Sequence, residues 1–415
     1  MEKEINESRA KRNIALYKKY KLFSYDLIFY YAVEVLFYTV VKGFSLSELM
    51  YLSSIYAFSA FVWQLFGSFI VDKIGIKKSI ITGNILVTIN MFLFIVSTEF
   101  WMFAFANCFM SLGFALKSLT ESNLLYGSLK KIGKRESFSK VEGKSVSRFY
   151  IIDAIASIIS GFLFVINGYL PFILCFVTMI IATIISFGFE DLKVEDEDEK
   201  LTIRENLRSF REIILHKRNK AMLLFAFVFW GLVSVIRTLY RAIILDIGIK
   251  EEYSTMVVFI ATVFIALGSR AVYGIEKVTK NRTLTVFTYV LLISSMVIGI
   301  VGLYNNLTLA SLSIFLIALA LISIIQGAYR VAIKRYVLNF TTHKYRNKIT
   351  SSYYIVENLG QTLILFISGL ILEFTTNSIA CIMFSVVALI IMSLILIYMK
   401  DKIGLRPEQY ENLNL

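Results

Sequence analysis

The sequence GSFIVDKIGIKK at residues 67–78 is a short charged interruption between two long apolar segments. Apolar segments of about 20 residues are long enough for a helix to cross a bilayer. Gly75 permits a tight turn, and the carboxylate of Asp72 can cap the positive N-terminus of a helix or pair with a basic loop. The stretch therefore predicts two membrane-crossing helices joined by a short turn at one face of the membrane.

The whole chain has the composition of a polytopic membrane protein. Of its 415 residues, 57% are hydrophobic and 18% are charged, against roughly 25% charged residues in an ordinary soluble domain. A soluble protein could not cover this much apolar surface. The three cysteines and two histidines have no metal-binding or disulfide spacing. We therefore expect no metal, no cofactor and no enzymatic activity. The sequence contains no P-loop motif, so it gives no indication that ATP is the energy source.

Continuous apolar runs, rather than alternating ones, predict an all-α membrane protein. Each run has about the length that a membrane-spanning helix needs. The twelve predicted spans lie near residues 22–42, 46–70, 79–97, 100–124, 148–166, 168–188, 221–245, 253–274, 283–304, 307–332, 349–371 and 376–398.

The distribution of basic residues predicts the orientation. With the N-terminus in the cytoplasm, 39 of the 43 Lys and Arg residues lie on the inner side, and only Lys42 and Lys250 lie in outer loops. This bias is the positive-inside signal, so we expect both termini to be cytoplasmic. It also explains the net charge of +13 through the anionic inner leaflet, without a nucleic-acid partner.

A charged segment divides the chain into two halves. After the acidic run at residues 195–199, Thr202 and Glu205 form a capping box, and an amphipathic surface helix is expected to follow. A shift of 204 residues aligns Asp72-Lys73 with Glu276-Lys277 and Asp153 with Glu357, which indicates two six-helix repeats. The expected parts are an N-terminal tail, an N-terminal bundle, a linker, a C-terminal bundle and a C-terminal tail, at residues 1–21, 22–188, 189–220, 221–398 and 399–415.

The stretch at residues 67–78 resembles the signature loop of the major facilitator superfamily, G-x-L-x-D-[RK]-x-G-[RK]-[RK]. Asp72, Lys73, Gly75 and Lys77 match this pattern, and the segment LYGSLK at residues 125–130 is similar to a bacterial subset of the family. The resemblance implies a secondary transporter that works by alternating access.

The resemblance also implies a cytoplasmic latch between the two halves. Its candidate residues are Asp72, Lys73, Gly75, Lys77 and, in the degenerate second copy, Glu276. Asp153 and Glu357, at equivalent positions of the two repeats, are expected to serve the latch or helix packing.

Ionisable residues inside membrane helices are functional candidates because an intramembrane charge is expensive. In the family the first, fourth, seventh and tenth helices line the cavity. The expected cavity residues there are Tyr30, Lys117, Glu121, Arg237, Arg241 and Gln326. For Lys117 and Glu121, four residues apart, a local salt bridge is the simpler interpretation.

Glu34 and Asp26 are the candidates for proton coupling. Glu34 lies about 18 Å into the first predicted span, near the middle of a ~30 Å bilayer core. Asp26 lies near the cytoplasmic end, where it could simply reach the interface. A pairing of Glu34 with Arg237 on the seventh helix is a further hypothesis. Phe109 occupies the position of an arginine that the family carries four residues before a glycine, here Gly113, and this weakens the case for proton coupling.

Three functions remain open. The first is proton-coupled efflux of a small amphiphilic compound, which fits the aromatic-rich helices and a central carboxylate. The second is uptake of an anionic solute, with Arg237 and Lys117 as its partners. The third is a non-transporting membrane receptor or assembly factor. The expected setting is a bacterial plasma membrane, with the lipid bilayer, a small-molecule substrate and protons or another coupling ion as partners and with a monomer as the assembly.

Overall fold

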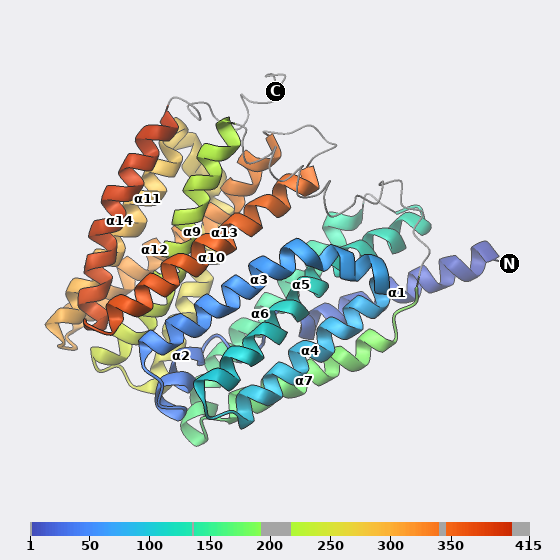
Figure 1. Ribbon diagram of the computed structural model, residues 1–415, viewed down its shortest axis with the longest axis horizontal. Helices are drawn as coiled ribbons and strands as arrows, with labels where there is room; N and C mark the ends of the chain where they lie inside the picture. Colours follow the sequence, from blue (N-terminus) through green and yellow to red (C-terminus); the bar gives the residue numbers. More distant parts are fainter. Residues whose placement is uncertain (1, 135–136, 192–216, 340–345, 401–415) are drawn as a thin grey trace. The chain divides into compact units, whose positions relative to one another are not determined.

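The computed structural model describes residues 2–134, 137–191, 217–339 and 346–400 (Figure 1). Every regular element in these ranges is a helix, which confirms the predicted all-α class. The chain forms two compact units, Met1–Gly43 with Phe58–Lys200 and Phe44–Ala57 with Leu201–Leu415. The predicted amphipathic helix after residue 201 lies outside the described residues.

The first unit contains α1 and α4 to α7, with part of α3. Within it, α1 packs against α5, α6 and α7, and α4 packs against α5 and α7. Its helices are α1 Glu2–Ser24, α2 Glu34–Leu36, the π-helix η1 Phe37–Val41, α3 Leu46–Ile74, α4 Ile76–Val96, α5 Phe100–Lys131, α6 Phe138–Ile166 and α7 Leu170–Phe187.

The second unit contains α9 to α14 and the first residues of α3. Here α11 packs against α12 and α14, as α4 does against α5 and α7 in the first unit. Its helices are α9 Lys217–Asp246, α10 Glu251–Thr279, the 3-10 turn η3 Lys280–Arg282, α11 Thr283–Tyr304, α12 Leu309–Asn339, α13 Arg346–Leu372 and α14 Asn377–Lys400.

The first helix differs from the prediction. The expectation of one helix over residues 22–42 is wrong, because α1 ends at Ser24 and helical structure resumes only at Glu34. Phe29, in the break, has a φ of 70°. The residues expected to form a polar N-terminal tail make up most of α1. There Asn13 exchanges two hydrogen bonds with the backbone of Glu190, of 2.9 and 2.8 Å.

Ten helical stretches of the described residues are long and apolar enough to cross a membrane. One of them, Glu251–Tyr304, contains both α10 and α11, which η3 joins. The broken region at 22–42 is not among the ten. The count of twelve spans and the cytoplasmic side of the termini therefore stay predictions.

Glycines allow several helices to approach one another closely. A Cβ atom on Gly83 of α4 would lie 2.8 Å from the carbonyl oxygen of Gly113 on α5, and one on Gly113 would lie 2.7 Å from the oxygen of Gly83. In the second unit, a Cβ on Gly268 of α10 would lie 2.1 Å from the carbonyl oxygen of Ile324 on α12. Small residues commonly permit such contacts between membrane helices. The contact between α4 and α5 places the polar side chains of α4 beside those of α5.

Candidate functional site

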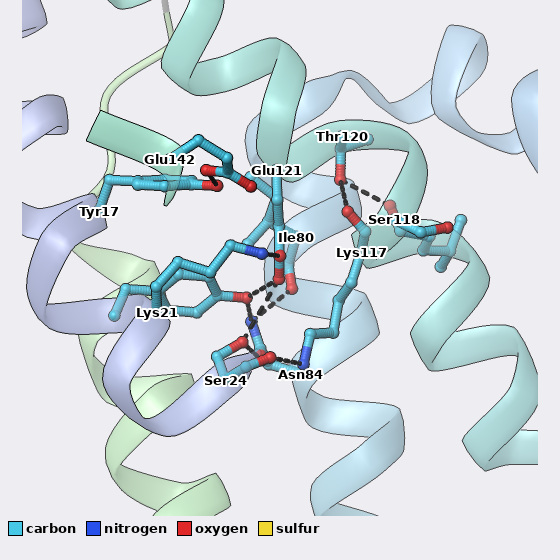
Figure 2. A network of polar contacts seen from close by, with 12 residues as sticks. Tyr17, Lys21, Ser24, Ile80, Asn84, Lys117, Ser118, Thr120, Glu121 and Glu142 are labelled. Carbon is cyan, nitrogen blue, oxygen red and sulfur yellow. Dashed lines mark hydrogen bonds and ion pairs between the residues drawn. The ribbon is translucent and has the colours of Figure 1, made fainter. Parts of the chain in front are cut away.

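A buried ion pair joins the first helix to α5 in the first unit. The ammonium of Lys21, near the end of α1, contacts Oε2 of Glu121 in the middle of α5 (Figure 2). Lys21 is 5% exposed and Glu121 is 4% exposed. Bringing two charges into a protein interior has a large desolvation cost, which close contact and further hydrogen bonds can offset.

Neutral polar groups complete the surroundings of Glu121. The hydroxyl of Tyr20 donates a 2.6 Å hydrogen bond to Oε1, and the hydroxyl of Ser24 lies 3.3 Å from the same oxygen. The amide of Asn84, on α4, donates to the Tyr20 hydroxyl at 2.8 Å and to the carbonyl of Ile80 at 2.8 Å. Three helices therefore hold this carboxylate in one position, as Figure 2 shows.

Lys117 is a second buried ammonium, one turn before Glu121 on α5. Its Nζ donates a 2.7 Å hydrogen bond to the backbone carbonyl of Ser24 and lies 4.9 Å from the centre of the Phe114 ring. Lys117 is 2% exposed. The carboxylates of Glu121 and Asp26 also attract this ammonium electrostatically. The predicted local salt bridge between Lys117 and Glu121 is therefore corrected, because Glu121 pairs with Lys21 and Lys117 holds the end of α1.

The two proton-coupling candidates lie at the break between α1 and α2. Asp26 is half-buried, and its Oδ1 accepts hydrogen bonds from the backbone nitrogen of Leu27 at 2.9 Å and the hydroxyl of Tyr31 at 3.0 Å. Glu34 is half-buried at the start of α2 and accepts a 3.3 Å hydrogen bond from the hydroxyl of Tyr30. Both carboxylates therefore interact with tyrosines of their own segment.

An aromatic cluster surrounds Tyr30, which is 2% exposed. Its ring stacks on Phe94 of α4 with a centroid separation of 6.1 Å and meets the edge of Phe172 of α7 at 5.3 Å. Phe172 also stacks on Phe37 at 3.6 Å. The Tyr30 ring therefore packs within this cluster, and its hydroxyl donates a hydrogen bond to Glu34. The predicted role of Tyr30 in lining a cavity stays a prediction.

The predicted site residues of the second unit lie on two helices, α9 and α12. Arg237 and Arg241 of α9 and Gln326 of α12 are all half-buried. Arg330, one turn after Gln326, places its guanidinium 3.7 Å from the centre of the Trp230 ring. The pairing of Glu34 with Arg237 stays a prediction, because the two residues belong to different units.

The predicted latch residues lie at helix ends and within helices. Asp72 and Lys73 are exposed at the end of α3, and Lys77 is half-buried in the first turn of α4. Gly75 joins the two helices with a φ of 86°, which confirms its predicted role in a tight turn. Glu276 of α10 is half-buried. The latch itself stays a prediction.

Asp153 and Glu357 occupy corresponding helices, α6 and α13. Asp153 is half-buried and lies close enough to Asp26 for the two carboxyl groups to interact electrostatically. Glu357 is 5% exposed and accepts a 3.0 Å hydrogen bond from the hydroxyl of Tyr329 on α12. This contact supports the helix-packing alternative for Glu357.

The sequence prediction missed Tyr20, Lys21, Ser24 and Asn84. The boundary at residue 21 assigned Tyr20 and Lys21 to a polar tail. A signal was nevertheless present, because Tyr17, Tyr20, Lys21 and Ser24 recur at the spacing of one helical face. Tyr17 lies on that face as well, and its hydroxyl donates a 2.5 Å hydrogen bond to Glu142 of α6.

Comparison with known proteins assigns the sequence to a family. A sequence model described as the Major Facilitator Superfamily matches residues 22–313. No curated protein matches the chain.

Solved transporters have a similar fold. The nucleoside transporter NupG superposes with a TM-score of 0.76 at 9% sequence identity, covering 94% of this chain and 99% of NupG. The POT family transporter PepTSo gives a TM-score of 0.74 at 12% identity, covering 95% of this chain and 98% of that chain. A POT family transporter in complex with 5-aminolevulinic acid gives 0.70 at 15% identity, covering 95% and 96%. At these identities the likeness establishes the fold alone.

Proposed function

The chain belongs to the Major Facilitator Superfamily, and we propose that it is a proton-coupled secondary transporter that exports a small amphiphilic compound by alternating access. The family membership establishes a membrane-embedded transporter, and the similarity to solved transporters establishes the fold. The proton, the direction of transport and the chemistry of the compound are the proposed elements.

The observation that carries the proposal is the buried ion pair of Lys21 and Glu121. In a low-dielectric interior, a carboxylate is stable either as an ion with a close cation or as a neutral acid. A proton on Glu121 would cancel its attraction to Lys21 and leave that ammonium without its counter-ion. Glu121 can therefore either bind a proton or pair with Lys21, but it cannot do both. Protonation of Glu121 can thus be coupled to a change in the contact between α1 and α5.

The position of the pair supports a role in helix movement. Glu121 belongs to α5, whereas Lys21 and Tyr20 belong to the last turn of α1, directly before the break at residues 25–33. Loss of the ion pair would weaken the contact between α1 and α5 at the point where α1 ends. We assign Glu121 the principal proton-binding role and keep Asp26 and Glu34 as further candidates.

Aromatic side chains near the break support an amphiphilic compound rather than a strongly polar one. Phe94 and Phe172 contact the Tyr30 ring, and Phe37 stacks on Phe172. The carboxylate of Glu34 accepts a hydrogen bond from the Tyr30 hydroxyl at this cluster. A compound bound at the break between α1 and α2 would contact aromatic rings of α4 and α7 beside a carboxylate. In this proposal Asp72, Lys73, Gly75, Lys77 and Glu276 serve the latch.

Proton coupling can be tested with purified protein in liposomes that contain a pH-sensitive dye. A panel of amphiphilic compounds is added under an imposed pH gradient, and compound-dependent proton flux is recorded. We expect flux for the unchanged protein and none for Glu121→Gln, because the amide cannot exchange a proton. Glu99→Gln is the matched control, since Glu99 is exposed at the start of α5.

Equal compound-dependent flux in the unchanged protein and in Glu121→Gln would contradict the assigned proton site. The direction is tested separately in inside-out membrane vesicles. Export predicts that an active compound accumulates in these vesicles when their interior is acidic. Accumulation of an anionic solute in right-side-out vesicles instead would establish uptake.

A further inference from the structure

The helix α1 has two chemically different faces. The face that packs on the first unit consists of the buried residues Ala10, Asn13, Ile14, Tyr17, Tyr20, Lys21 and Ser24. The exposed side contains four basic residues, Lys11, Arg12, Lys18 and Lys19. At about 3.6 residues per turn, these four lie within roughly one third of the helix circumference, opposite the buried face. We refer to them as the basic face of α1.

Acidic groups neutralise little of the charge on the basic face. Arg12 contacts Oε1 of Glu190 at 3.2 Å, and the Arg12 side chain is nevertheless 60% exposed. In the part of the chain that the structure describes, this is the only ion pair that the basic face makes. The three lysines are exposed. Clusters of this size on one side of a helix are typical of surfaces that bind anionic lipid headgroups.

Contacts of the buried face place this part of α1 at the boundary of the membrane. The side chain of Asn13 donates a 2.9 Å hydrogen bond to the backbone of Glu190, shortly after the apolar helix α7 ends. One turn later, the hydroxyl of Tyr17 donates to Glu142, near the start of the candidate span Lys140–Ile166. The basic face therefore lies at the level where α7 leaves the apolar layer and α6 enters it.

We propose that the basic face of α1 binds the anionic headgroups of lipids in the leaflet where α7 ends and α6 begins. Charged side chains at this level avoid the hydrocarbon layer, and long lysine side chains can extend along the helix to reach the headgroups. An anionic leaflet attracts each basic residue that lies against it. The proposal concerns a lipid partner and does not depend on the proposed transport function.

Lipid binding at this face would hold α1 in its docked position. The helix carries Tyr20 and Lys21 to Glu121 on α5, directly after Lys18 and Lys19 of the basic face. Headgroups bound to Lys18 and Lys19 would therefore favour the arrangement in which the last turn of α1 contacts α5. Anionic lipid should accordingly stabilise the first unit.

The first test measures the accessibility of single lysines in the full-length protein. Nanodiscs are prepared from phosphatidylcholine alone or from equal parts of phosphatidylcholine and phosphatidylglycerol. Acetylation by a neutral reagent is then quantified at each lysine by mass spectrometry. Acetylation of Lys11, Lys18 and Lys19 should slow about fivefold in the anionic discs, which corresponds to the attraction of one basic residue to such a surface. The control is Lys250, an exposed single lysine beside Glu251 and Glu252, and its rate should change much less.

The second test measures thermal unfolding of the purified protein in detergent. Short-chain phosphatidylglycerol is added, and short-chain phosphatidylcholine and inorganic phosphate at equal ionic strength are the comparisons. We expect only phosphatidylglycerol to raise the unfolding temperature.

Two matched triple variants assign this response to a surface. When Lys11, Lys18 and Lys19 are all replaced by Gln, the apparent affinity for phosphatidylglycerol should fall at least about fivefold. The same replacement of Lys130, Lys131 and Lys134, which are exposed at the end of α5, should leave the affinity unchanged. All six side chains are exposed, so both variants should fold.

Equal slowing of acetylation at Lys250 and at the α1 lysines would show a general surface effect and overturn the proposal. Equal responses of the two triple variants, or equal stabilisation by inorganic phosphate, would overturn it as well. The acidic run at residues 195–199 is the rival partner in the sequence. If the α1 triple variant lowers the unfolding temperature equally in both lipids, and neutral residues at 195–199 abolish this loss, the basic face binds that run instead of lipid.

Discussion

The ammonium of Lys117, in the middle of α5, donates a 2.7 Å hydrogen bond to the backbone carbonyl of Ser24, where α1 ends. Non-helical backbone within a membrane protein persists where protein groups or water satisfy its polar atoms. Further along the break, the hydroxyl of Ser160 on α6 lies 3.5 Å from the carbonyl of Phe29. Side chains of two other helices thus support the interruption of the first one.

The buried ion pair should respond asymmetrically to substitution. Lys21→Met leaves Glu121 as a buried carboxylate without its cation, which should lower the free energy of unfolding by about 3–5 kcal/mol. The double variant Lys21→Met with Glu121→Leu should recover most of this loss. Thermal and denaturant unfolding in detergent measure both changes. Lys18→Met, at an exposed lysine of α1, is the control. Additive losses in the double variant would show that the two residues do not interact.

Lys42 should stabilise one end of the first unit. Its ammonium donates hydrogen bonds of 3.1 and 2.7 Å to the carbonyl groups of Ile95 and Ser97, at the end of α4. Lys42→Met should therefore lower the free energy of unfolding by about 1.5–3 kcal/mol, the range for hydrogen bonds to charged groups. It should also speed amide hydrogen exchange in the last turn of α4. Lys250→Met is the matched control at the other predicted outer lysine, which is exposed.

The glycines of α10 should differ sharply in their tolerance of a methyl group. Gly268→Ala places a Cβ 2.1 Å from the carbonyl oxygen of Ile324, whereas Gly274→Ala meets no atom within 4 Å. The first substitution should destabilise the protein by at least about 1–3 kcal/mol, as overpacking does. The second should be neutral or slightly stabilising. Unfolding temperatures of the two purified variants provide the comparison, and equal values would contradict close packing of α10 on α12.

The predicted topology can be tested by labelling with an impermeant thiol reagent on intact cells. Single cysteines are introduced in a background that lacks Cys108, Cys175 and Cys381. Cysteines that replace the exposed residues Glu99, Asn167 and Asn306 should react from outside. A cysteine that replaces Lys134, between α5 and α6, should react only after the membrane is permeabilised. The opposite pattern would reverse the orientation derived from the basic residues.

Glu357 and Tyr329 should act together in helix packing. Their 3.0 Å hydrogen bond is buried between α12 and α13, so Tyr329→Phe and Glu357→Gln should each lower the unfolding temperature. The losses should be less than additive in the double variant. If Glu357 instead serves the latch, Glu357→Gln should change transport and leave stability unaltered. Asp72→Asn, at an exposed helix end, is the comparison, because it should affect transport alone.

The amino-acid sequence determined the helical class, the family and most helix positions. Long apolar runs can satisfy their backbone in lipid only as helices or closed barrels, and continuous rather than alternating apolarity selects helices. Asp72, Lys73, Gly75 and Lys77 sufficed to indicate the family, whose model matches residues 22–313. The turn at Gly75 also followed from its residue type, since a φ of 86° favours glycine.

The tertiary structure decided where the first helix breaks and which charges meet. No glycine or proline lies between residues 22 and 42, so local propensity contains no signal for a break. The interruption at Ser24 is stabilised by Lys117, which is 93 positions away in the chain. Likewise, spacing on one helix suggested a pair of Lys117 and Glu121, but Lys21 of α1 contacts Glu121 instead. Contacts between distant segments depend on how helices pack, and periodicity along a single helix does not encode that packing.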